Sequence, residues 1–324
     1  MSVEAKRCLV TGAAGFIGSH LARRLVDEGA EVHALVRPGT ALDKIVGLAD
    51  RITIHRVDLT NRQRLETCLK AVEPEYVFHL GAPTRGASQP TVEAARFALD
   101  AILSPLLDLV DILASLPHPP LNFVRAGTIA EPGHIATPFR EEQREEPVTP
   151  YGAAMLAGTQ HLALLAKGLP FPVVSARLAL TYGIGQSSEF LVPSLFKACL
   201  TGNETLVRRP QDRRDLIHVD DVVDALILLA LSPQPGAPHV NICSGIAPTV
   251  AEVAAMVCEA MDADPELIKL GSAEPGEPIS EHRSDPRLAS QLYGWEARIP
   301  IEQGIRMIAD ELIGELDAKG HARG

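Results

Sequence analysis

The first half of the chain alternates short β-branched apolar runs with amphipathic stretches of helical period. Between residues 16 and 30, apolar side chains recur at helical spacing, and Gly29 is a residue type that ends helices. Apolar runs typical of strands lie at residues 7–11, 31–36, 51–59, 76–82, 121–128 and 172–180. This alternation predicts an α/β fold with a doubly wound parallel sheet.

Two features of the pattern interrupt this regularity. Residues 92–116 read as one long helix, but Pro105 lies in its interior, where the missing N–H and the ring should bend it. From about Gly185 onward, shorter helical patterns are separated by polar, Pro-rich joins. We therefore expect a dinucleotide-binding domain over residues 1–184 and mainly a smaller C-terminal lobe over residues 185–324, with segments that cross back to the sheet.

Composition narrows the class of protein. The formal net charge is -11 and the pI is near 5.5, whereas nucleic acid or anionic lipid would require a basic face. No apolar run approaches the roughly 20 residues of a membrane span, and the N-terminal residues run straight into a strand. We expect an unprocessed cytoplasmic protein that binds neither nucleic acid nor membrane.

The cysteines suggest no redox or metal chemistry. The chain has 5 cysteines, an odd set without a CxxC pair and without histidines at metal-binding spacing. We expect them to be reduced core residues, and we expect no metal site.

A glycine-rich loop follows the first predicted strand. Gly12, Gly15 and Gly18 connect this strand to the first predicted helix. Small residues let the backbone approach a pyrophosphate, and the helix N-terminus offers free N–H groups. A lone glycine triplet would be weak evidence, but the strand before it and the helix after it match the Rossmann fingerprint. The sequence therefore predicts a dinucleotide site.

The end of the second strand bears on which dinucleotide binds. An acid there would hydrogen-bond a ribose 2′-hydroxyl, but this strand ends in Val36 and Arg37. Arg37 could pair with a 2′-phosphate, or it could be an exposed turn residue. Asp58, at the end of the next strand, could reach the adenine or cap the following helix. We expect NADP(H) rather than NAD(H).

These residues resemble the extended short-chain dehydrogenase/reductase family, which contains nucleotide-sugar epimerases, dehydratases and 4-ketoreductases. The resemblance spans nearly the whole chain and rests on residues 11–18, 77–82, 150–155, 214–226 and 292–305. It implies a Rossmann-type domain with a substrate-binding lobe. The cofactor contacts that we expect are Gly12, Gly15, Phe16, Ile17, Gly18, Arg37, Asp58, Leu59, Leu80, Gly81, Ala82 and Tyr151.

The catalytic residues that the resemblance implies lie after the fifth strand and at a helix start. Thr128 takes the place of the family's hydroxyl residue, which hydrogen-bonds the substrate oxygen, and Tyr151 that of its proton donor or acceptor. One helical turn later the family has a lysine that holds the nicotinamide ribose and favours the phenolate. Here that residue is Met155, which can do neither. A neutral tyrosine can still act as an acid, so the pattern favours a one-way ketoreductase.

Further departures from the family narrow the reaction. The family's 4,6-dehydratases have Asp-Glu after the threonine, whereas this chain has Ile129 and Ala130, so we do not expect dehydration. Many relatives carry an asparagine where this chain has Leu180.

Arginines concentrate between residues 206 and 221 of this acidic chain. Guanidinium groups bind diphosphates well, and the resemblance implies that Arg214, with Arg208 nearby, contacts a nucleotide diphosphate. The alternative is a solvated face paired to Asp212 and its neighbours. Asp220 and Asp221 fit the cap of the following helix, and Asp285 that of the helix after Pro286.

Our leading hypothesis is NADPH-dependent reduction of a nucleotide-linked keto sugar, with a 4-keto-6-deoxyhexose as the candidate. The first alternative is a nucleotide-sugar epimerase that keeps its cofactor bound. Arg37 and Met155 argue against it, because such epimerases in this family usually hold NAD and need a base. The second alternative is a non-catalytic nucleotide-binding protein.

We also expect a homodimer built on residues 95–116 and 151–167, whose small and apolar residues suit close helix packing.

Overall fold

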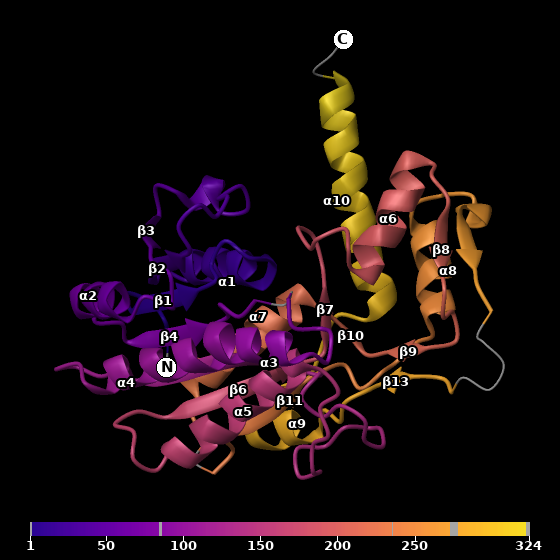
Figure 1. Cartoon of the computed structure of the whole chain (residues 1–324). Coiled ribbons are helices and arrows are strands. Elements are labelled where there is room, and N and C mark those ends of the chain that lie inside the picture. The colour runs from indigo at the N-terminus through magenta and orange to yellow at the C-terminus, as the bar shows by residue number, and fades with distance from the viewer. Residues whose placement is uncertain (1, 84–85, 235, 273–277, 322–324) are drawn as a thin grey trace.

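The structure is a computed structural model that describes residues 2–83, 86–234, 236–272 and 278–321 (Figure 1). Its centre is one 7-stranded sheet with the strand order β11-β6-β5-β4-β1-β2-β3. All pairs in this sheet are parallel. The chain winds outward from β1 in both directions, which confirms the predicted α/β fold with a doubly wound, Rossmann-type sheet.

The sheet consists of β1 (Arg7–Thr11), β2 (Glu31–Val36), β3 (Ile52–Arg56), β4 (Tyr76–His79), β5 (Asn122–Thr128), β6 (Val173–Leu178) and β11 (His239–Ile242). The shorter strands are β7 (Leu180–Tyr182), β8 (Thr205–Val207), β9 (Arg213–Arg214), β10 (Leu216–His218), β12 (Ile268–Leu270) and β13 (Glu281–His282). The α-helices are α1 (Phe16–Asp27), α2 (Arg62–Val72), α3 (Val92–Ala98), α4 (Ser104–Ala114), α5 (Pro150–Leu165), α6 (Leu191–Thr201), α7 (Val219–Leu231), α8 (Val250–Ala260), α9 (Arg287–Tyr293) and α10 (Ile301–His321).

Apolar side chains on both faces explain why the sheet is covered on both sides. In β1, Cys8 and Val10 pack into a core with α1 and α7, whereas Leu9 packs into a second core with α2, α4 and α5. Successive side chains of a strand point to opposite faces, so a continuous apolar run needs helices on each.

A π-helical turn interrupts the helical stretch just before Pro105, where the sequence predicted a bend. The π-helix Leu99–Leu103 lies between α3 and α4, and Pro105 is in the first turn of α4, where its missing N–H costs little. Ala101 of this turn reaches the cofactor cavity described below.

The chain beyond residue 185 contributes to both the sheet domain and a smaller lobe. β11 is a strand of the sheet, and α7 and α9 pack on it. In the smaller lobe, α6, α8 and α10 enclose a separate core that includes Phe196, Val253 and Ile305. In Figure 1 this smaller lobe lies beside the sheet, and α10 projects away from it. The division at residues 184 and 185 as a domain boundary stays a prediction.

Candidate functional site

The glycine loop leaves its backbone open to a ligand. Gly12 has a φ of +69°, and a Cβ there would lie 3.0 Å from the carbonyl carbon of Leu80. Gly15 is the N-cap of α1, and no side chain caps this helix end. A Cβ at Gly18 would collide with the Gly12 carbonyl, so only glycine allows this close packing of loop and helix. The loop fits a pyrophosphate held by backbone N–H groups.

A cavity of about 420 Å³ lies beside this loop at the carboxyl ends of β1, β2 and β4. The predicted residues that line it are Gly12, Gly15, Arg37, Asp58, Leu59, Leu80, Gly81 and Ala82. Sequence reasoning missed Thr40, Val57, Thr60, Phe97 and Ala101, which also line it. Phe16, Ile17 and Gly18 begin α1 and are not among its lining residues; Ile17 packs against the core.

The buried Thr11 holds the backbone of two residues that line the cavity. Its Oγ1 accepts hydrogen bonds from the backbone N–H groups of Leu80, at 3.1 Å, and Gly81, at 3.0 Å. The same oxygen lies 2.9 Å from Nδ1 of His79. Burial and the charge of Arg125 lower the pKa of His79 to about 3, so this imidazole is neutral and serves to hold the strand end.

Arg37 and Asp58 face the same cavity from neighbouring strand ends. Asp58 accepts hydrogen bonds from the backbone N–H of Thr60 at 2.9 Å and from its hydroxyl at 2.8 Å. These bonds, with a smaller contribution from the charge of Arg37, lower the pKa of Asp58. The cap of the next helix is Asn61, which accepts from the N–H of Arg64, so Asp58 does not have the capping role.

Tyr151 and Thr128 meet where α5 begins. Thr149 caps α5 by accepting from the N–H of Gly152 at 3.0 Å. A Cβ at Gly152 would lie 2.5 Å from the carbonyl oxygen of Ala130, so the first turn of α5 presses against the loop after β5. This packing brings the half-buried Tyr151 into hydrogen-bond contact with the Thr128 side chain.

The surroundings of Tyr151 favour its protonated form. Burial raises its pKa, whereas the hydrogen bond with Thr128 and the charge of Arg125 oppose that rise and the charge of Glu131 adds to it. The net pKa is above the ordinary value of 10.0, so the phenol carries its proton at neutral pH. Tyr151 also packs in an apolar cluster with Ala82, a residue of the cofactor cavity.

A comparison with known protein families shows which family the chain belongs to. Residues 8–243 match the model of the NAD-dependent epimerase/dehydratase family. The chain belongs to this family. The match covers the glycine loop, Thr128, Tyr151 and all strands of the sheet, which confirms the resemblance to the extended short-chain dehydrogenases/reductases.

Similar proteins of known activity cover nearly the whole chain. A dTDP-L-rhamnose 4-epimerase of Burkholderia thailandensis is 27% identical, over 98% of each chain. A dTDP-6-deoxy-L-talose 4-dehydrogenase (NAD(P)+) of Kitasatospora kifunensis is 27% identical, over 93% of each. The UDP-glucose 4-epimerase of Thermus thermophilus, solved with NAD, superposes with a TM-score of 0.80 at 26% identity, over 95% of this chain and 99% of that one. By their names all three act on nucleotide sugars, and the last two use or bind a nicotinamide cofactor.

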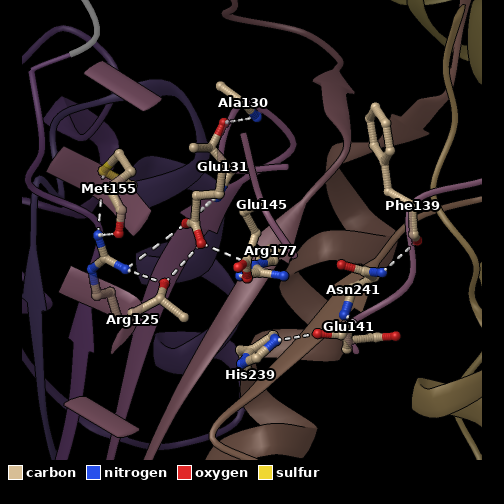
Figure 2. A network of polar contacts seen from close by, with 12 residues as sticks. Arg125, Ala130, Glu131, Phe139, Glu141, Glu145, Met155, Arg177, His239 and Asn241 are labelled. Atoms are coloured by element: carbon tan, nitrogen blue, oxygen red, sulfur yellow. Dashed lines mark hydrogen bonds and ion pairs between the residues drawn. The ribbon is translucent and has the colours of Figure 1, made fainter. Parts of the chain in front are cut away.

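Met155 lies in the core of this family member and not on the cavity wall. It is 2% exposed and packs with Ala98, Ile102 and Ala154. Figure 2 shows the guanidinium of Arg125 against it, and Nη2 of Arg125 donates to the Met155 carbonyl oxygen at 2.9 Å. The expected catalytic position is therefore occupied by a buried packing residue.

A buried charge cluster that sequence reasoning missed surrounds this contact. Glu131, which is 0% exposed, accepts from Nε of Arg177 at 2.9 Å and from the hydroxyl of Thr159 at 2.8 Å, and it lies 3.9 Å from Nη1 of Arg125. Arg177 also donates to Glu145 (Figure 2). A sequence signal existed, because Arg125 and Arg177 are charged residues inside otherwise apolar strands, and such charges are almost never buried unless paired.

The predicted diphosphate-binding arginines lie in a second cavity, of about 330 Å³, in the smaller lobe. Arg208 and Arg214 line it together with Arg209 and Asp212. Nη2 of Arg214 donates to Asp212 at 2.8 Å. Burial alone would raise the pKa of Asp212, but the hydrogen bonds from Arg209, Ser280 and Arg214 lower it to about 2. Arg214 is therefore paired with Asp212 and also lines a cavity, and its contact with a diphosphate stays a prediction.

The acidic residues that we expected to cap helices behave differently from one another. The N-cap of α7 is His218, and Asp221 instead accepts from the backbone N–H groups of Arg298 and Ile299, so the capping role predicted for Asp221 was wrong. The N-cap of α9 is Pro286, so Asp285 is not the N-cap, although it accepts from the backbone N–H of Arg287 in the first turn of this helix.

Two remaining expectations concern metals and membranes. Within the part of the chain that the structure describes, no cluster of three or more His, Cys, Asp or Glu side chains is arranged to hold a metal ion. All 5 cysteines are free, and all except Cys199 are buried. None of the described helices is both long and apolar enough to cross a membrane.

Proposed function

We propose that this protein reduces a keto group on a nucleotide-linked sugar with NADPH, and that Tyr151 donates the proton. A 4-keto-6-deoxyhexose is our candidate for the sugar. The observation that carries the proposal is the pairing of Thr128 with a tyrosine whose burial keeps it protonated. A protonated phenol is ready to act as an acid, which reduction needs, and it must first lose its proton to act as a base, which oxidation needs.

The residues divide the chemistry between them. A nicotinamide held in the cofactor cavity would supply the hydride to the carbonyl carbon. Thr128 and Tyr151 hydrogen-bond the carbonyl oxygen, and Tyr151 transfers its phenolic proton to that oxygen as it becomes an alkoxide. The products are the alcohol and a Tyr151 phenolate, which regains a proton from water. The glycine loop of residues 12–18 holds the pyrophosphate, and Arg208 and Arg214 bind the diphosphate of the sugar nucleotide.

Arg37 supports NADPH as the reductant. It lines the cofactor cavity at the end of β2, where a 2′-phosphate could pair with its guanidinium. Asp58 in the same cavity is held as a carboxylate by Thr60, and its charge would partly offset that of Arg37 in the absence of a phosphate.

The epimerase of Burkholderia thailandensis supports the alternative of a nucleotide-sugar 4-epimerase. An epimerase oxidises and re-reduces one carbon, so it consumes no cofactor overall. The test incubates the purified protein with a dTDP-linked 4-keto-6-deoxyhexose and NADPH, and separately with dTDP- or UDP-hexoses alone. We expect stoichiometric oxidation of NADPH in the first reaction. Interconversion of two epimers without net NADPH oxidation would establish the alternative, and nucleotide binding without either reaction would make the protein non-catalytic.

We also propose a homodimer. Apolar side chains remain exposed on the π-helix that follows α3 and on α5, with Leu99, Leu164 and Leu165 among them. Two such helix pairs can bury these side chains in a four-helix contact. Light scattering at micromolar concentration should give the mass of a dimer, and a monomer there would refute this part of the proposal.

A further inference from the structure

Arg125 reaches from the middle of β5 to the helix that carries Tyr151. Its Nη2 lies 2.9 Å from the carbonyl oxygen of Met155 and 3.4 Å from the Met155 sulfur (Figure 2). The Arg125 side chain is 2% exposed. Burial lowers the pKa of Arg125, but the ordinary pKa of a guanidinium is so high that the group stays protonated. A permanent positive charge is thus fixed beside the helical turn that joins Tyr151 to Met155.

Helix α5 is shaped to receive this guanidinium. A Cβ on Gly158 would lie 2.7 Å from Nη2 of Arg125, so only glycine leaves the required space. One residue further, the Thr159 hydroxyl accepts from Nη1 of Arg125 at 2.9 Å. The backbone of Met155, the gap at Gly158 and the hydroxyl of Thr159 therefore fix the cation against one side of the helix.

Other charged or titratable groups in the neighbourhood limit the net effect of Arg125. Glu131 lies 3.9 Å from Nη1 of Arg125 and shares its negative charge with Arg177. His79 on β4 is neutral, as its low pKa shows. The groups that act on the ionisation of Tyr151 are the Thr128 hydroxyl, Arg125 and Glu131. Of these, Arg125 carries the positive charge.

We propose that Arg125 supplies, from β5, the positive charge that the family otherwise places on the lysine one turn after the tyrosine, and that it stabilises the Tyr151 phenolate formed by proton donation. The inference rests on the proposed function. Arg125 is a positioning residue, because it acts through Tyr151. It is not among the residues that line the cofactor cavity, so the lysine's other role, holding the nicotinamide ribose, does not pass to it.

The test measures the ionisation of Tyr151 directly. The chain has 4 tyrosines, so incorporated 3-fluorotyrosine gives few ¹⁹F signals, and Tyr151→Phe assigns the one of interest. The fluorine lowers the phenol pKa, which brings the titration below alkaline unfolding. Arg125→Met should raise the pKa of this residue by about one unit, as expected when a nearby opposite charge is removed. The oxidation of the alcohol product, which needs the phenolate, should then slow about tenfold at pH 8.

Arg177→Met is the matched control. It removes an equally buried arginine that binds the same Glu131 carboxylate, so it carries a similar structural cost. The Tyr151 signal should shift by clearly less than in Arg125→Met. If Arg125→Met does not fold, Gly158→Ala displaces the Arg125 guanidinium and should move the pKa of Tyr151 upward by a smaller amount.

The outcomes separate this inference from the proposed function. No upward shift in Arg125→Met or Gly158→Ala, or an equal shift in Arg177→Met, overturns the role of Arg125. Restoration of the original Tyr151 pKa in the double variant Arg125→Met/Met155→Lys would support the role of Arg125, because α5 would then carry the missing positive charge itself. Failure of the proposed function would instead appear as unchanged keto-sugar reduction in Tyr151→Phe, whatever the ¹⁹F titration shows.

Discussion

Around the glycine loop, the ligand would be held largely by backbone groups, and eight of the predicted cofactor contacts line the cavity. Around Tyr151, the side-chain charges of Arg125 and Glu131 shape the site, and the chain departs from the family pattern at Met155. The backbone of the loop depends on Gly12 and Gly18, because any Cβ there meets neighbouring atoms. A positive charge has no such constraint, since any element that reaches the tyrosine can carry it. Under our proposal for Arg125, this chain carries the charge on another element while the glycine loop stays fixed.

The largest effect should come from the charge cluster of the catalytic region. Glu131→Ala leaves Arg125 and Arg177 without their shared carboxylate, and breaking a buried pair in this way costs about 3–5 kcal/mol of unfolding free energy. Denaturant unfolding measures this loss. Glu142→Ala is the control, because Glu142 is 70% exposed in its pair with Arg140 and should contribute less than about 1 kcal/mol. Equal losses in the two variants would mean that the cluster does not stabilise this region.

The cofactor region should respond with a smaller and more selective change. Arg37→Ala should weaken NADPH binding by about 1.5–3 kcal/mol, the usual value of a charge-assisted hydrogen bond, and leave NADH nearly unchanged. Titration of both cofactors, followed by calorimetry or fluorescence, gives the two affinities. If both fall equally, Arg37 does not read the 2′-phosphate.

The smallest effect should come from Met155 itself. Met155→Leu conserves volume in the cluster with Ala98 and Ile102, so it should cost less than about 1.5 kcal/mol in stability. Its contact with Arg125 through the backbone carbonyl remains, and the rate of keto-sugar reduction should change by less than about threefold. A loss approaching that of a tyrosine variant would show that the methionine has a chemical role that its burial does not suggest.

The same contrast explains what could be predicted from the sequence. Six of the 7 sheet strands, the loop at Gly12 and eight of the 17 residues that line the cofactor cavity followed from local patterns, because the predicted cavity residues follow strands that are visible in the hydrophobic periodicity. The charge cluster did not, because residues 125, 131, 159 and 177 meet only when β5, β6 and α5 pack. Asp221 was misassigned for a related reason, since its partners at residues 298 and 299 come from a distant segment. Phe97 at the end of α3 and Ala101 in the π-helical turn also line the cavity, whereas the sequence pattern at Pro105 predicted only a bend.

The central claim is that Tyr151 is a working acid in spite of the missing lysine. The most direct test compares the rate of keto-sugar reduction by wild type and Tyr151→Phe at pH 7, with NADPH affinity measured on the same samples. Loss of a positioned proton donor should lower the rate by roughly 10²–10⁴-fold while NADPH binding persists. If the phenylalanine variant reduces the keto sugar as fast as wild type, Tyr151 is not the proton donor and the account of this site is wrong.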